Sequence, residues 1–311
     1  MKLSSIVSRF TQKPASNTAI MNLIAAETER ELLLIGRGLT NQVCAGGIYQ
    51  DLHQAEFKVF SQFGDDGIIQ YLIHQVKPEN HTFIEFGVQD YSESNTRFLL
   101  MNNNWRGLII DGDRQAMAAL KLQDYYWRND LTAVGEFITR ENINQLFLDN
   151  GFSGEIGLLS VDIDGNDYWV WQAINAVNPV IVVVEYNSVF GSKHAVSVPY
   201  DPGFVRTQAH YSNLFWGASL KAFYTLAAQK GYVFVGCNSN GNNAYFIRKN
   251  RVGKIPVVSL EEGYVESHFR ESRDMNGNLT FLRGNQRFEA IKELQVVDVQ
   301  TGLTVHLRDL A

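Results

Sequence analysis

Cysteine is scarce in this sequence of 311 residues, which contains only Cys44 and Cys237. No cysteine and histidine cluster has zinc spacing, which excludes a structural zinc site, and we expect two free thiols in a reducing cytosol. Long apolar runs are also missing: the longest, residues 180–184, is far too short to span a bilayer. Serines interrupt the first ten residues, so we expect no signal peptide, no membrane span and a cytoplasmic protein.

Basic residues are no more plentiful than acidic ones. The chain has 27 Lys and Arg against 33 Asp and Glu, a formal charge of −6. Proteins that bind duplex nucleic acid need basic surface to neutralise phosphates, so we expect no nucleic-acid partner. Hydrophobic residues make up 45% and charged residues 19%, which is ordinary for a folded protein and excludes a disordered one.

Short apolar segments alternate with helical patterns after residue 60. We predict strands at 82–86, 107–110, 131–138, 156–161 and 179–185, and helices at 67–75, 94–103, 115–123, 139–148 and 168–176. Continuously apolar strands separated by helices are typical of a parallel sheet that is covered on both faces. A helix at 220–230 and strands at 232–236 and 243–248, with Asn240-Gly241 between them, predict an antiparallel terminal pair.

The two ends of the chain have different patterns from the middle. Residues 1–18 are polar and lead into an amphipathic helix at 19–39, which we expect to end near Gly36 and Gly38 and to serve in packing or a homo-oligomer contact. Short β-like segments follow at 294–299 and 304–307. We therefore divide the chain into an N-terminal helical extension (1–55), an α/β domain (56–250) and a C-terminal elaboration (251–311).

Polar side chains follow four of the predicted strands. They are Glu85 with Gly87, then Asp111, then Asp162 with Asp164, and finally Glu185 with Asn187. Ligands of parallel α/β sheets bind outside the carboxyl ends of the strands. Any one of these residues could be a helix cap or part of a solvated turn, but four acidic strand ends on one edge indicate a site.

The first two strand ends suit an adenosine ligand. Gly87 permits a sharp turn against a ligand, although the G-x-G-x-x-G spacing of a dinucleotide site is missing. Asp111, directly after the second strand, could accept hydrogen bonds from both hydroxyls of a ribose. Asp113 competes for that role, with helix capping as its alternative.

The fourth strand end is rich in carboxylates. Asp162, Asp164 and Asp167 lie within six positions, and with Glu185 they offer the hard oxygen ligands that Mg²⁺ or Ca²⁺ prefers. One of them could also be a general base, while we interpret Asp167 as a charge at a helix N-terminus. His194 and His210, in the long linker 187–218, are further candidates for a base or ligand, although most loop histidines are simply solvated.

Several motifs together resemble the FkbM-like family of class I methyltransferases, which use S-adenosylmethionine. The resemblance covers residues 56–250 and depends on SQFGDDGII (61–69), FIEFG (83–87), SNT (94–96), SVDIDGNDYWVW (160–171), VVEYN (183–187) and NNAYFIR (242–248). It implies a Rossmann-like α/β fold with a mostly parallel seven-stranded sheet. It also implies methyl transfer to a hydroxyl group, which we expect on a saccharide.

The resemblance further implies roles for individual residues. A cofactor site would include Glu85, Gly87, Asn95 and Asp162, with Asp111 on the ribose. Related sugar O-methyltransferases of the macrocin type hold Mg²⁺ at the fourth and fifth strand ends, which implies Asp162, Glu185 and Asn187 as ligands. Asp164 would be the base, with His210 and His194 as competitors. The alternatives are a binding module for a nucleotide-sugar or a partner protein, and a metal-dependent transferase or hydrolase without S-adenosylmethionine.

Overall fold

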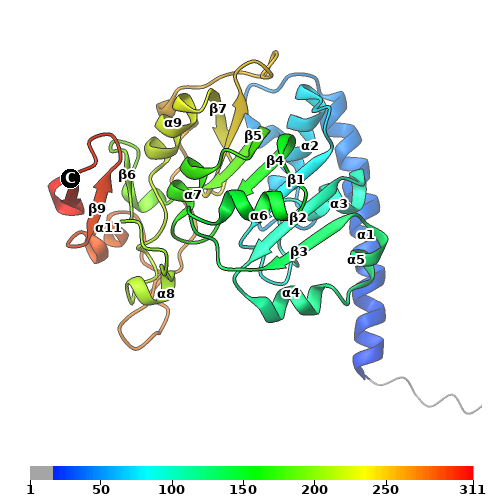
Figure 1. The fold of residues 1–311 in the computed structure, drawn as a ribbon, viewed down its shortest axis with the longest axis horizontal. Coiled ribbons are helices and arrows are strands. Elements are labelled where there is room, and N and C mark those ends of the chain that lie inside the picture. Colours follow the sequence, from blue (N-terminus) through cyan, green and yellow to red (C-terminus); the bar gives the residue numbers. More distant parts are fainter. Residues whose placement is uncertain (1–16, 311) are drawn as a thin grey trace, which may run out of the picture.

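A seven-stranded sheet forms the centre of the protein, which a computed structural model describes for residues 17–310 (Figure 1). The strand order is β3-β2-β1-β4-β5-β8-β7, and β8 runs opposite to the other six strands. The strands are β1 (Thr82–Phe86), β2 (Arg106–Asp111), β3 (Leu131–Gly135), β4 (Gly154–Val161), β5 (Val177–Glu185), β7 (Tyr232–Cys237) and β8 (Asn243–Arg248). This arrangement confirms the predicted Rossmann-like fold, a mostly parallel seven-stranded sheet with an antiparallel terminal pair.

Helices cover both faces of the sheet, as the continuously apolar strands predict. They are α2 (Asp65–Val76), α3 (Arg97–Asn103), α4 (Arg114–Leu120), α5 (Asp124–Arg128), α6 (Ile143–Asp149), α7 (Asp167–Ala173) and α9 (Leu220–Gln229). One core contains Ile84 of β1 with Trp171 of α7, and the core on the other face contains Phe83 with Phe98 of α3. Successive residues of β1 therefore pack in opposite directions, which fixes the register of the strand.

Two helices begin later than predicted because side chains compete for the backbone. The helix expected from residue 94 begins at Arg97, since Ser94, Asn95 and Thr96 all donate hydrogen bonds to Glu85. The helix expected from residue 139 begins at Ile143. In the intervening loop Asn142 accepts from the Thr139 amide at 2.8 Å.

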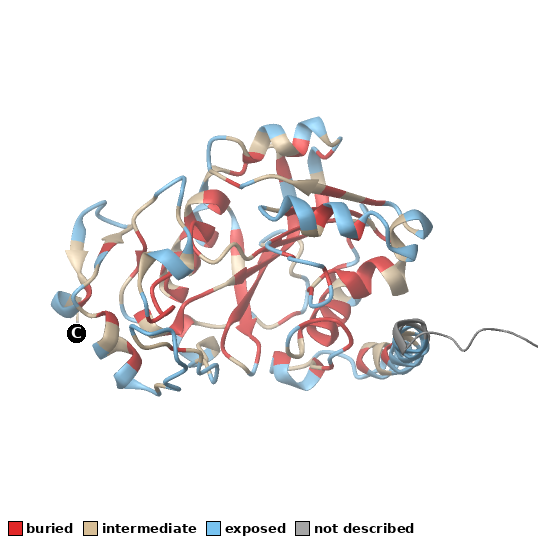
Figure 2. Cartoon of the chain, turned by 90° about the horizontal axis from the view of Figure 1, so that it is seen from below, coloured by how far each residue is buried: buried red, intermediate tan, exposed pale blue. Residues whose placement is uncertain are grey.

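The N-terminal helix α1 (Asn17–Ala45) is longer than predicted and runs along the outside of the domain (Figure 1). Gly36 does not end it: a Cβ there would lie 2.6 Å from Val59 and 2.9 Å from Phe98, so this glycine allows close packing. Seen nearly end-on, the helix is mostly exposed (Figure 2). Among its exposed apolar side chains are Ile24 and Leu34, and the homo-oligomer contact through this helix remains a prediction.

The polar lead-in predicted for residues 1–18 lies almost entirely outside the described residues. Within residues 17–310, no helix is both long and apolar enough to cross a membrane. Both cysteines are free, as expected; Cys237 is buried and Cys44 is partly exposed.

A second, three-stranded sheet joins the linker after β5 to the C-terminal part of the chain. It consists of β6 (Val196–Ser197), β9 (Gln295–Asp298) and β10 (Thr304–His306), in the order β10-β9-β6. The short elements around it are η3 (Leu52–Ala55), η4 (Ser188–Phe190), α8 (Arg206–Ala209), α10 (Leu260–Gly263), α11 (Asn285–Ile291) and η5 (Leu307–Leu310). The strands predicted near residues 294–299 and 304–307 are confirmed, and their sheet flanks one end of the main sheet (Figure 1).

Candidate functional site

A cavity of about 550 Å³ lies at the carboxyl ends of β1, β2, β4 and β5. Its volume is in the range of small-molecule sites, and its place is the one that parallel α/β sheets use for ligands. The side of the cavity opposite the strand ends is closed by segments 204–207, 213–216 and 267–271. Six predicted site residues line it: Gly87, Asp111, Asp162, Asp164, Glu185 and Asn187.

The turn after β1 fits tightly against the end of β4. Gly87 has a φ of +68°, and a Cβ at this position would lie 1.8 Å from the carbonyl oxygen of Asp162. Only glycine avoids both the left-handed strain and this clash. The turn is also tied to β2, because the amide of Gln89 donates to Asp111 Oδ2 at 2.7 Å.

Asp111 is held in a fixed position on the cavity wall. Its Oδ2 accepts from Gln89 and its Oδ1 accepts from the amide of Asp113, each at 2.7 Å. Ile110 and Phe137 line the cavity beside it, and the Phe137 side chain is 46% exposed. An oriented carboxylate flanked by apolar side chains suits a ribose with an attached flat base.

Asp113 has the capping role that was its alternative reading. Its Oδ1 accepts hydrogen bonds from the amides of Gln115 and Ala116, each at 2.9 Å, at the start of α4. Asp111 therefore faces the cavity, whereas Asp113 caps a helix.

Glu85 and Asn95 lie behind the cavity and do not line it. The Glu85 side chain is 4% exposed and accepts hydrogen bonds from Ser94 Oγ at 2.6 Å and from the Asn95 amide at 2.8 Å. Burial raises the pKa of Glu85 above its usual value. Asn95 donates through its side chain to Ser160 Oγ at 3.1 Å. Glu85 therefore fixes the loop before α3, and Asn95 ties that loop to β4.

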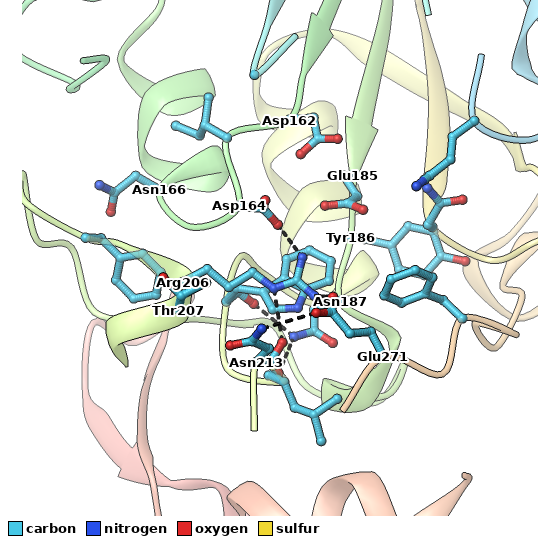
Figure 3. Close-up of a pocket in the computed structure, with 18 of the residues that line it drawn as sticks. Asp162, Asp164, Asn166, Glu185, Tyr186, Asn187, Arg206, Thr207, Asn213 and Glu271 are labelled. Carbon is cyan, nitrogen blue, oxygen red and sulfur yellow. Dashed lines mark hydrogen bonds and ion pairs between the residues drawn. The ribbon is translucent and has the colours of Figure 1, made fainter. Parts of the chain in front are cut away.

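Three carboxylates converge where β4 and β5 end. Oxygen atoms of Asp162, Asp164 and Glu185 lie within 4.8 Å of one another, from strands whose ends are level because Val161 pairs with Val184 (Figure 3). Burial, and then the nearby Glu185, raises the pKa of Asp162 well above its usual range. Burial, and then Asp164, raises the pKa of Glu185 in the same direction. Carboxylates this close do not all stay ionised without a cation between them; in the absence of one, they share a proton.

The backbone turns sharply after Asp162. Asp164 has a φ of +55°, so the chain is no longer extended there. Asp167 fixes the turn by accepting from the amides of Ile163 at 2.7 Å and Gly165 at 2.8 Å. Asp167 is the first residue of α7, in line with its interpretation as an N-terminal charge, and burial raises its pKa to about 6.

Arg206 is the central cation of the site, and sequence analysis did not identify it. Its Nη1 donates to Asp164 Oδ1 at 2.5 Å, its Nη2 lies 3.4 Å from Glu271, and its Nε donates to the carbonyl of Asn213 at 3.0 Å (Figure 3). The guanidinium also lies over the ring of Trp216. An arginine in a polar linker has no periodicity to mark it; the one available signal was its place in a long linker that follows a strand end.

The two predicted histidines do not line the cavity. Nδ1 of His210 pairs with Ser212 Oγ at 2.7 Å, its ring packs on Tyr211, and burial lowers its pKa. The carbonyl of His194 accepts a hydrogen bond from Ser219. Neither ring reaches the carboxylate cluster, so the structure does not bring these histidines together with the other candidates.

Asn187 lines the cavity, but its amide group is engaged with the linker. Its Nδ2 donates to the carbonyls of Leu214 and Trp216, at 2.9 and 3.0 Å. Its Oδ1 accepts from the amide of Val189 at 3.0 Å. Asn187 therefore anchors the segment that closes the cavity, and the cluster itself consists of three carboxylates.

No family model and no curated protein sequence matches the chain. Similar solved structures include an O-methyltransferase from Bacillus cereus in complex with SAH, with 14% identity, a TM-score of 0.38, and coverage of 78% of this chain and 94% of that one. Another is the N-terminal domain of EvdMO1 in the presence of SAH and D-fucose, with 9% identity, a TM-score of 0.38, and coverage of 70% of this chain and 94% of that one. A third is the O-methyltransferase TomG from Streptomyces achromogenes, involved in tomaymycin synthesis, in complex with SAM. It has 15% identity, a TM-score of 0.35, and coverage of 65% of this chain and 91% of that one. Similarities of this size do not transfer a residue's role, a ligand or an activity.

Proposed function

We propose that the chain is an S-adenosylmethionine-dependent O-methyltransferase whose acceptor is a saccharide hydroxyl. One observation carries the proposal: the Gly87 turn, Asp111 and the carboxylate cluster line a single cavity. The cavity lies at the carboxyl edge of a sheet with the class I strand order. A site for an adenosine group and a site for proton removal are thus adjacent, as methyl transfer to a hydroxyl requires.

The residues present fit the proposed cofactor. Each oxygen of Asp111 accepts one backbone hydrogen bond, and a carboxylate oxygen can accept more, so capacity remains for ribose hydroxyls. The cavity is lined by five carboxylates and two guanidinium groups, a surplus of negative charge that suits a cationic ligand. S-adenosylmethionine, when bound, supplies an electrophilic methyl group on a positively charged sulfur.

The carboxylate cluster provides the base in this proposal. An acceptor hydroxyl must lose a proton as it is methylated, and a positioned carboxylate can take it. Arg206 holds the Asp164 carboxylate in place at 2.5 Å, and a paired cation favours the ionised form of a carboxylate. Asp162 and Glu185, whose pKa values are raised, lie within reach to share the proton afterwards.

A divalent metal is a further part of the proposal. Carboxylate oxygens within 4.8 Å of one another are the hard donors that Mg²⁺ takes, so the cluster fits the ion chemically, with Asp162 and Glu185 as ligands and the Arg206-paired Asp164 as the base. Mg²⁺, when bound, would supply a Lewis acid that orients vicinal hydroxyls and lowers their pKa. Asn187 is less suited to the role than predicted, because its oxygen is engaged with Val189.

A thermal-shift panel tests the proposal against its alternatives. We expect SAH to raise the melting temperature of the full chain and Mg²⁺ to add to that effect. Stabilisation by nucleotide-sugars without any response to SAH would support a binding module instead. Stabilisation by Mg²⁺ alone would support a metal-dependent enzyme that does not use S-adenosylmethionine.

A further inference from the structure

A shallow groove extends from the cavity toward the outside of the molecule. Its wall is formed by Phe63, Asn240 and residues of segment 268–281. Four residues line both the groove and the cavity: Phe63, Asn240, Phe269 and Glu271. Because the two share a wall, a ligand longer than the cavity would leave it along this groove.

The groove carries exposed cations and aromatic faces. Arg270 and Arg273 line it, as do Phe269, Leu279 and Phe281, whose side chains are 36%, 47% and 50% exposed. The guanidinium of Arg270 lies 5.5 Å from the centre of the Phe281 ring. Within the described part of the chain, Arg270 has no carboxylate partner, whereas Arg273 lies 3.3 Å from Glu271. One guanidinium is therefore uncompensated.

The segment that forms this wall has a fixed local structure. Arg273 and Leu279 form an antiparallel bridge, and the turn between them is capped by Asp274, which accepts from the amides of Asn276 and Asn278. The amide of Arg273 also donates to the carbonyl of Ser212 in the linker over the cavity. Arg270 and Phe281 thus stand on the two arms of a small hairpin, which places cation and ring side by side before any ligand binds.

The groove and the cavity have opposite charge. Five carboxylates and two guanidinium groups line the cavity, while the groove has two guanidinium groups and the single carboxylate of Glu271. Arg206, on the cavity side, is already paired with Asp164 and Glu271. An anionic group would be repelled from the inner cavity and attracted to the groove, so the charge contrast orients a long ligand.

We propose that this groove binds a phosphate or carboxylate of the acceptor, at a distance from the hydroxyl that is methylated. Arg270 and Arg273 would hold the anion through charge-assisted hydrogen bonds. The exposed faces of Phe269 and Phe281 would pack on the apolar side of a sugar ring. The inference rests on the proposed function, since it identifies the acceptor as an anionic saccharide.

Calorimetry with three probes tests the groove. Glucose 1-phosphate, glucuronate and glucose are titrated into the full chain at low salt, with SAH present. We expect at least one anionic sugar to bind about tenfold or more tightly than glucose, and the preference to weaken as salt is added. A preference for the phosphate alone, or for the carboxylate alone, identifies the anion.

Three variants test which side chains cause the preference for an anionic sugar. Arg270→Gln should reduce the preference for the anionic sugar to about threefold or less. Phe281→Ala should weaken the binding of both anionic and neutral sugars to a similar extent. Arg128→Gln, on the exposed surface of α5, is the matched control and should leave the preference unchanged.

The possible outcomes distinguish failure of the groove proposal from failure of the proposed function. Equal affinity for charged and neutral sugars, or no binding of either anion at about 10 mM, would overturn the groove proposal while SAH binding persists. An unchanged preference in Arg270→Gln, with a normal melting temperature, would also overturn it. Absence of SAH binding would instead contradict the methyltransferase proposal itself.

Discussion

Arg206 Nη1 lies 2.5 Å from Asp164 Oδ1 and thereby joins the segment over the cavity to the carboxyl end of β4. The contact neutralises one of three clustered carboxylates. Asp162 and Glu185 are left to share a proton or a cation. The pair therefore links closure of the cavity to the charge state of the residues that would remove the acceptor's proton.

The role of Asp164 is tested by Asp164→Asn. General-base catalysis typically contributes roughly 10²–10⁴-fold in rate, so we expect turnover to fall by about that factor. SAH affinity should change little, because the ribose contact is proposed at Asp111 and not at Asp164. The measurement is single-turnover methyl transfer together with calorimetric titration of SAH.

The histidines provide the matched controls for the base. His194→Ala and His210→Ala should keep turnover within about threefold of the wild type, because neither ring lines the cavity. Near-normal turnover in Asp164→Asn, together with loss of turnover in either histidine variant, would assign the base to that histidine.

The Gly87 turn makes a prediction about stability. Gly87→Ala would force a Cβ against the Asp162 carbonyl in a left-handed conformation, so we expect about 2–4 kcal/mol of destabilisation. Gly154→Ala is the control: its φ is +69°, but a Cβ there meets nothing within 4 Å, so about 1 kcal/mol is expected. Chemical denaturation measures both. Equal losses would show that the contact with Asp162 contributes nothing.

The pH dependence of stability tests the carboxylate cluster. The pKa of Glu185 is raised from 4.5 to about 8, chiefly by burial. Because the folded state binds this proton more tightly than the unfolded state, the stabilisation is complete below pH 4.5 and is lost as the pH rises toward 8. Relative to Glu185→Gln, the wild type should therefore lose about 2–5 °C of melting temperature between pH 5 and pH 8.

The same comparison has a control and a metal arm. Glu136→Gln, a half-exposed residue paired with Arg114, should show no such pH trend. Mg²⁺ should raise the wild-type melting temperature more at pH 8 than at pH 5, since the ion competes with the shared proton. A melting temperature that responds equally to Mg²⁺ in the wild type and in Glu185→Gln would remove Glu185 from the proposed metal site.

Much of the fold could be predicted from the sequence because buried parallel strands consist of short apolar runs. The strands at 82–86 and 243–248 have the predicted bounds. The acidic strand ends were predicted for the same reason, since parallel strands bring their carboxyl ends to one edge. That rule needs only the order of elements along the chain, and it placed Asp111, Asp162 and Glu185 on one cavity.

The remaining residues of the site depend on contacts between distant parts of the chain. Asp164 and Arg206 are 42 positions apart, and Arg206 and Glu271 are 65 apart, with no local pattern that pairs them. Glu85 resembles a cofactor residue by position, yet its oxygens are occupied by the loop that follows it. A strand-end position shows which edge a residue occupies, whereas competing hydrogen-bond donors decide whether its side chain reaches the cavity.

The central claim, that the cavity binds S-adenosylmethionine through Asp111, is tested most directly by calorimetric titration of SAH into the wild type and two variants. We predict saturable binding to the wild type and a loss of about 1–3 kcal/mol in Asp111→Ala through the missing ribose hydrogen bonds. Asp113→Ala removes a helix cap and should lower stability by about 1 kcal/mol while leaving SAH affinity unchanged. No heat of binding to the folded wild type at millimolar SAH would contradict the account.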